Sequence, residues 1–181
     1  ACDLGFIDPR DMLDRLERAF DTMRQLARFR GHFYNWYDLS DLSVLGPRYI
    51  STVDSGNLAG HLIALRQACL TMAEAADETV AMRLHAVAEQ AYAWVAEMEF
   101  GFLYDVERKL FTIGYHPDTF TADASLYDLL GSEARLASFV AIAKKDVPVE
   151  HWFRLSRALN RNAGSVALLS NDIPVNVSYK A

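Results

Sequence analysis

The sequence predicts a mainly α-helical fold with one β-hairpin and long aromatic loops. Two observations carry this prediction. Apolar residues recur every three or four positions in five separate segments, which is the period of an amphipathic helix. One further segment, residues 100–115, has two short apolar runs around a polar turn, which is typical of a hairpin. The chain has 181 residues, 51% hydrophobic and 23% charged, a composition that supports a sizeable buried core.

The first helix is expected to begin at Asp8-Pro9, because Asp is a favoured N-cap and Pro suits the first helical position. Its apolar positions continue to about Arg30, and Gly31 is expected to end it. Residues 32–53 lose the helical period. They predict a long ordered loop with at most a short strand, and ordered loops of this length are often functional.

Two more helices are expected next. The first of them starts at residues 54–57, which are rich in helix-start residue types, and its apolar stripe runs to Met72. The following helix runs from Val80 to Met98. The break between these two helices is expected near Ala76-Asp77, a position without Gly or Pro.

The second half of the chain predicts the hairpin and two further helices. The hairpin spans residues 102–113 around the polar turn 105–109. A fourth helix is expected from Ser125 to Lys144, and a short fifth helix follows Val147-Pro148 and includes Leu159. Beyond these elements the tail has no helical period.

Charge and composition exclude several classes of function. The formal net charge is -6, from 18 Lys+Arg against 24 Asp+Glu, which argues against nonspecific binding to nucleic acid or anionic membranes. No apolar run reaches the ~20 residues of a membrane span, and the first residues lack a signal-peptide pattern. Two cysteines and five histidines without HxxxH or HExxH spacing predict no disulfide framework, metal or cofactor. We therefore expect a cytoplasmic chain without a membrane segment.

The predicted fourth helix carries the most informative charges. Glu133 falls in the middle of its leucine-rich face, whereas Asp128 and Arg135 share the opposite face. If both faces are covered, Glu133 is a desolvated carboxylate. Such a group serves as a general acid or a ligand-binding carboxylate, and the alternative is a structural ion pair.

Two other segments are candidates for ligand binding. Flat aromatic side chains stack on the apolar faces of sugars, so Trp36 and Tyr37 with Asp38 and Arg48 predict a carbohydrate subsite; packing beneath the loop is the alternative. Residues 54–57 place Asp54 and Asn57 at a helix start, where a carboxylate and backbone N–H groups are presented. A simple helix cap explains the same residues.

Several longer motifs resemble one family. They are Gly31-His32-Phe33-Tyr34-Asn35-Trp36-Tyr37-Asp38, the stretch from Pro47 to Leu62 that includes Asp54-Ser55-Gly56-Asn57-Leu58, Glu99-Phe100-Gly101-Phe102-Leu103-Tyr104-Asp105, the stretch from Tyr127 to Ser138, and Asp146-Val147-Pro148-Val149-Glu150-His151-Trp152-Phe153. Over about residues 3–160 the chain resembles the glucoamylase-like middle region of cyclic β-1,2-glucan synthases. The resemblance implies an (α/α)6 barrel that handles β-1,2-glucan. In those large enzymes of the inner membrane, this region is linked to cyclisation by transglycosylation, and related stand-alone proteins hydrolyse β-1,2-glucan.

The chain departs from the family pattern in three ways. It is too short for twelve helices, the stretch between residues 62 and 99 is shorter than in the family, and the residues after 170 differ from the family's continuation. We therefore expect a fragment: a partial (α/α)6-barrel-like array over residues 1–160 with a divergent tail over residues 161–181. Uncovered helix faces then predict a homo-oligomer.

The expected function is binding, cleavage or transfer of a β-1,2-linked glucan oligosaccharide. Two carboxylates must flank a glycosidic bond for hydrolysis, and the predicted pair is Asp128 and Glu133. The residues predicted to bind substrate are Trp36, Tyr37, Asp38, Arg48, Asp54, Asn57, Arg135 and Trp152. Two alternatives stay open: a non-enzymatic helical homo-oligomer, and a different hydrolytic or metal-dependent activity at an oligomer interface.

Overall fold

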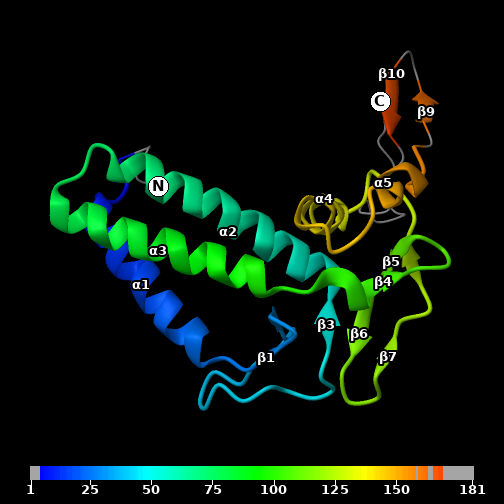
Figure 1. The fold of residues 1–181 in the computed structure, drawn as a ribbon, viewed down its shortest axis with the longest axis horizontal. Coiled ribbons are helices and arrows are strands. Elements are labelled where there is room, and N and C mark those ends of the chain that lie inside the picture. Colours follow the sequence, from blue (N-terminus) through cyan, green and yellow to red (C-terminus); the bar gives the residue numbers. More distant parts are fainter. Residues whose placement is uncertain (1–4, 158, 163–164, 169–181) are drawn as a thin grey trace.

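Three long helices form the main body of the protein, and short strands gather at one end of it (Figure 1). A computed structural model describes residues 5–157, 159–162 and 165–168. In these residues the α-helices are α1 (Pro9–Gln25), α2 (Thr52–Ala73), α3 (Glu78–Glu97), α4 (Arg135–Lys144) and α5 (Glu150–Arg154). Helices α2 and α3 form a hairpin, α1 lies along α3, and α4 packs across the first half of α2.

Short strands connect these helices. The 3-10 helix η1 (Phe100–Leu103) leads into them. Strand β1 (Arg28–Phe29) pairs with β2 (His32–Phe33), and β9 (Leu159–Asn162) pairs with β10 (Ser165–Leu168). The two three-stranded antiparallel sheets are β3 (Ile50–Ser51), β6 (Gly114–His116) and β7 (Thr121–Ala122), and β4 (Tyr104–Asp105), β5 (Leu110–Thr112) and β8 (Leu126–Tyr127). Strand β3 continues directly into α2.

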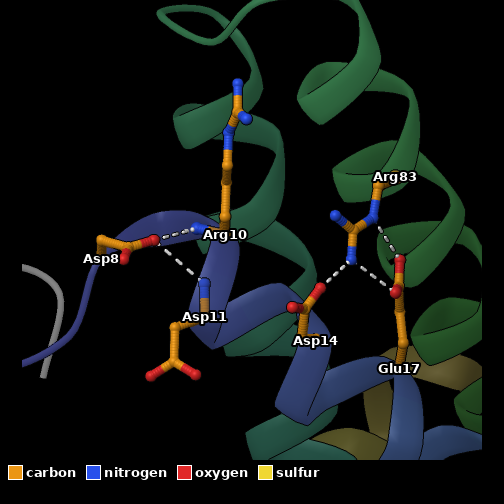
Figure 2. A network of polar contacts seen from close by, with 6 residues as sticks. All are labelled: Asp8, Arg10, Asp11, Asp14, Glu17 and Arg83. Atoms are coloured by element: carbon orange, nitrogen blue, oxygen red, sulfur yellow. Dashed lines mark hydrogen bonds and ion pairs between the residues drawn. The ribbon is translucent and has the colours of Figure 1, made fainter.

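Helix α1 is amphipathic and covers the outside of α3. The predicted cap is confirmed, because the Asp8 carboxylate accepts hydrogen bonds from the backbone N–H groups of Arg10 and Asp11. On its polar side, Arg83 of α3 donates to Asp14 at 2.5 Å and to Glu17 at 2.7 and 2.8 Å (Figure 2). These bonds hold the pKa of both carboxyls below their usual values and join the polar flank of α1 to α3.

The core lies between α2, α3 and α4. Trp94, Leu84 and Met98 of the α3 segment are almost fully buried there. Gly56 allows α2 and α4 to touch, because a Cβ at this position would lie 2.5 Å from the Cα of Ala137. This contact brings the first turns of the two helices together.

The first helix ends earlier than its apolar period predicts. Helix α1 stops at Gln25, and the chain turns through Arg30 and Gly31 between β1 and β2. Both turn residues have positive φ, 49° and 80°, so Gly31 serves a hairpin turn rather than a helix C-terminus. The close approach of Glu97 and Met98 to Gly31 explains why a glycine is needed there.

The predicted start of the fourth helix at Ser125 is also wrong, because α4 begins at Arg135. Leu126 and Tyr127 instead form β8, which pairs with Thr112 and Phe111 of β5. Leucines spaced at helical intervals continue through this strand, and tertiary pairing overrides the local period. Asp128 and Glu133 therefore do not lie on a helix, and Glu133 is exposed rather than desolvated.

The remaining elements are shorter than expected. Helix α5 ends at Arg154, so Leu159 lies in β9 and not in a fifth helix. In the expected hairpin, Phe102 and Leu103 belong to the 3-10 helix, and the antiparallel pair is β4 with β5. Tail residues 169–181 lie outside the described residues. Across the part of the chain that is described, no helix combines the length and apolar character needed to cross a bilayer.

The contact at Gly56 generates a stability prediction. The variant Gly56→Ala places a methyl group against the backbone of Ala137, so the free energy of unfolding should fall by about 3 kcal/mol or more. Urea unfolding measures this change. The matched control is Gly101→Ala, whose added methyl group meets Asp146 at an ordinary 3.6 Å and should cost less than about 1 kcal/mol. Equal effects of the two variants would contradict the proposed importance of the α2–α4 contact.

Burial of His32 predicts a pH dependence of stability. Desolvation lowers the pKa of His32 from 6.5 to about 4, although its hydrogen bond to the Glu99 carbonyl opposes the shift. Between these values the unfolded chain binds the proton more readily, so the free energy of unfolding should decrease as pH falls from about 6.5 to about 4. His32→Gln should reduce this slope in urea unfolding, whereas His85→Gln at an exposed position should not. An unchanged slope in His32→Gln would refute the assignment.

Candidate functional site

Tyr49, Asp123 and His116 form a hydrogen-bonded chain at the β3–β6–β7 sheet. The Tyr49 hydroxyl donates to Oδ2 of Asp123 at 2.5 Å, and Nε2 of His116 lies 3.1 Å from Oδ1 of the same carboxylate. The rings of Tyr49 and His116 are 4.9 Å apart. The backbone N–H of Asp123 donates to Gly114 at 3.0 Å, which fixes the carboxylate beside the sheet.

Trp36 adds a solvent-exposed aromatic ring to the group formed by Tyr49, Asp123 and His116. Its ring stacks on Tyr49 with centroids 6.4 Å apart and an interplanar angle of 24°. The side chain is 51% exposed, so the stacked pair leaves one aromatic surface open. Gly114 permits the arrangement, since a Cβ there would overlap the Tyr49 hydroxyl and lie 2.6 Å from the Ile50 carbonyl oxygen.

Two further carboxylates, those of Asp54 and Glu133, lie where α2 and α4 begin. Tyr127 contacts Val53 and Ala134 in a small buried apolar group, and its hydroxyl donates to Oε1 of Glu133 at 3.4 Å. Asp54 follows Val53 in the first turn of α2, and Glu133 immediately precedes Ala134 at the N-terminus of α4. Positive helix ends favour carboxylates at both positions.

Electrostatic interactions link the group around Tyr49 to the group around Tyr127 and Asp54. Burial raises the pKa of the Tyr49 phenol, and its hydrogen bond to Asp123 and the charges of Asp123, Tyr127 and Asp54 raise it further. Tyr49 is therefore a protonated hydrogen-bond donor at neutral pH. We call the combined group the acidic-aromatic cluster; it consists of Trp36, Tyr49, Asp54, His116, Asp123, Tyr127 and Glu133.

The cluster offers the chemistry that a polyhydroxylated ligand needs. Carboxylates accept hydrogen bonds from hydroxyl groups, the phenols donate and accept, and an exposed indole packs against an apolar ring face. A cavity of about 280 Å³ adjoins Asp54 and is lined by Phe33, Tyr34, Asn35, Asp54, Ser55 and Leu58. Within the described ranges, no three His, Cys, Asp or Glu side chains are grouped to hold a metal ion.

Three predicted subsite residues have other partners in the structure. The Tyr37 hydroxyl donates to the Ala27 carbonyl and accepts from the Tyr34 N–H. Asp38 accepts from the backbone and side chain of Ser40 in a tight turn. Arg48 forms a 3.7 Å ion pair with Asp118. These contacts shape the loop around Trp36.

The other predicted residues lie in different surroundings. Asn57 is half-buried in α2, and its carbonyl accepts from His61. Arg135 is exposed in the first turn of α4. Trp152 of α5 packs beneath the Arg157 guanidinium, 5.8 Å from the ring centroid. Asp128 is exposed, and its carbonyl accepts from Ser156 on the side of α5.

The structure also adds residues that sequence reasoning missed. Tyr49 and Tyr127 lie inside two of the family-like motifs, so those motifs pointed to their segments without singling them out. His116 and Asp123 lie outside every motif. Asp123 is 74 residues from Tyr49 in the chain, and only the pairing of β3 with β6 and of β6 with β7 brings them together.

Comparison with known proteins supplies independent evidence. No protein-family model matches the chain. In an alignment 283 positions long, the chain is 26% identical to the cyclic β-(1,2)-glucan synthase NdvB of Rhizobium meliloti (strain 1021), and the alignment covers 92% of this chain and 10% of that protein. The chain thus spans about a tenth of the length of this curated relative.

A solved structure shows the same fold. The crystal structure of a glucoamylase-like protein from Bacteroides caccae ATCC 43185 matches with a TM-score of 0.65 at 14% identity, over 93% of this chain and 41% of that chain. These two matches confirm the resemblance inferred from the motifs. The chain is therefore similar to part of a cyclic β-(1,2)-glucan synthase and has the fold of a glucoamylase-like region.

Proposed function

We propose that this chain binds a β-1,2-linked glucan oligosaccharide at the acidic-aromatic cluster. One observation carries the proposal: the exposed Trp36 indole stacks on Tyr49, which donates a hydrogen bond to Asp123 and lies close enough to Asp54 and Tyr127 for their charges to raise its pKa. The similarity to a protein named for cyclic β-(1,2)-glucan supports this choice of ligand. The same similarity favours a glucan over other polyhydroxylated compounds.

We further infer that α1 to α5 are part of an (α/α)6 barrel. The glucoamylase-like fold supports this architecture, and this chain covers 41% of the matched structure. The predicted domain of residues 1–160 then contains all five of these helices, although its predicted boundary falls inside β9. In this arrangement the cluster occupies one end of the helical array, where connecting loops supply Trp36, Asp123 and Glu133.

Cleavage or transfer of the glucan would use two carboxylates on either side of the bond. Glu133 is the first candidate, because it is exposed, hydrogen-bonded to Tyr127 and close to a helix N-terminus. Asp54 is a better partner for it than Asp128. Asp54 lies close enough to the Tyr49 phenol for its charge to raise the pKa of that group, and Asp128 is not among the charges that do so.

Calorimetric titration with β-1,2-glucooligosaccharides tests the binding function. Trp36→Ala and Glu133→Gln should each weaken binding roughly tenfold, because they remove the stacking surface and a charged acceptor. The matched controls are Phe120→Ala and Glu89→Gln, which change exposed residues outside the cluster and should bind like the original chain. Absence of heat with the β-1,2-linked sugar, or equal binding of an α-1,4-linked glucan, would reject the proposal.

Catalysis is measured separately by release of new reducing ends. If the chain cleaves the glucan, Glu133→Gln should reduce the rate at least ~100-fold under saturating sugar, since general acid–base groups contribute 10²–10⁴-fold. Asp54→Asn should have a comparable effect and Asp128→Asn a small one. A large loss in Asp128→Asn with little loss in Asp54→Asn would instead favour the pair Asp128 and Glu133.

A further inference from the structure

Both oxygens of the Asp123 carboxylate have partners among the side chains of the protein itself. Oδ2 accepts a hydrogen bond from the Tyr49 hydroxyl at 2.5 Å, and Nε2 of His116 lies 3.1 Å from Oδ1. A bond from a hydroxyl to a carboxylate is charge-assisted and roughly twice as strong as one between neutral groups. Asp123 is therefore less suited to receive a ligand hydroxyl than Asp54, which is exposed in the first turn of α2.

The bond between Tyr49 and Asp123 ties the phenol ring to the β3–β6–β7 sheet. Tyr49 immediately precedes β3, and Asp123 immediately follows β7. They meet across β6, because Ile50 pairs with Tyr115 and Tyr115 pairs with Ala122. The backbone N–H of Asp123 also donates to a carbonyl of β6 at 3.0 Å. The carboxylate that receives the Tyr49 hydroxyl is thus itself anchored to the middle strand.

The Tyr49 ring in turn supports the exposed indole of Trp36. The two rings stack with an interplanar angle of 24°, and the indole is 51% exposed. Two backbone bonds of 3.1 Å hold the loop at this point: the Asn35 N–H donates to the Tyr49 carbonyl, and the Leu45 N–H donates to the Trp36 carbonyl. The backbone bonds fix the chain at Trp36, and the Tyr49 ring supports one face of the side chain.

We propose that Asp123 is a positioning residue of the ligand site: it holds the Tyr49 ring in place, and Tyr49 holds the Trp36 indole ready to stack on a sugar. His116 supports Asp123 at its other oxygen. A side chain that is ordered before binding loses less conformational freedom when the ligand arrives. The inference rests on the proposed binding of a glucan at the acidic-aromatic cluster, in which Asp123 then acts through Tyr49 and Trp36 rather than on the sugar.

NMR spectroscopy of the tryptophan indole N–H groups tests the positioning without any ligand. The chain has three tryptophans, Trp36, Trp94 and Trp152, and substitution of Trp36 and Trp152 assigns their signals. In Asp123→Ala the Trp36 signal should move toward its position in the urea-unfolded chain, because the Tyr49 ring no longer supports it in one orientation. The signals of Trp94, buried in the core, and of Trp152 on α5 should stay in place. An unchanged Trp36 signal would overturn the proposal.

Three further variants separate this role from general support of the loop. Asp123→Asn should retain the Trp36 signal, because an amide oxygen still accepts from Tyr49 and an amide N–H can donate to neutral His116. The matched control is Asp118→Ala, since Asp118 lies in the β6–β7 turn and pairs at 3.7 Å with the loop before β3. An equal movement of the signal in Asp118→Ala would contradict a specific role of Asp123. Tyr49→Phe breaks the same bond from its other end and replaces Asp123→Ala if that variant does not fold.

Calorimetric titration with β-1,2-glucooligosaccharides measures the consequence for binding. Asp123→Ala should weaken binding roughly fivefold, the cost of ordering one side chain when the ligand binds. The double variant with Trp36→Ala should bind like Trp36→Ala alone, within about twofold, because Asp123 acts through Trp36. Losses that multiply to about 50-fold would overturn the proposal, since independent losses show that Asp123 contacts the sugar by itself.

The proposed function and the positioning role fail in different ways. If the unaltered chain binds no glucan, the proposed function is rejected, and the NMR signals still decide whether Asp123 orders Trp36. If the chain binds the glucan but Asp123→Ala leaves the Trp36 signal or the affinity unchanged, the positioning role alone is rejected.

Discussion

The contact between Gly56 and Ala137 is the constraint on which the candidate site depends. It lets the first turns of α2 and α4 approach to backbone contact. Asp54 and Glu133 are each adjacent in sequence to a member of the buried group formed by Val53, Tyr127 and Ala134. The acids need no contact with each other to share a site, because the helices that carry them are already fixed. Helix packing thus positions two charges that belong to distant parts of the sequence.

Buried polar side chains hold the loops against this helical frame. Thr52 donates to the Thr112 carbonyl at 2.7 Å, and Thr112 in turn donates to the Leu103 carbonyl at 3.1 Å. His151, fully buried, lies 2.8 Å from the Ser138 hydroxyl and 3.0 Å from the Lys109 carbonyl. Strands of two or three residues have few ladder hydrogen bonds, so these side chains supply much of the missing order. The site can therefore be built from loops and still be well defined.

The sequence predicted the long helices well because local signals determine them. Asp8 and Asp77 cap helices through their own side chains, and each helix follows with an apolar period. The start of α4 could not be found this way, since Leu126 fits a helical period but pairs in a sheet with Thr112. The motifs likewise singled out Trp36 and Asp54, whereas Asp123 required knowledge of strand pairing over 74 residues. Helix caps and apolar periods could thus be predicted from neighbouring residues, whereas the pairing of strands from distant segments could not.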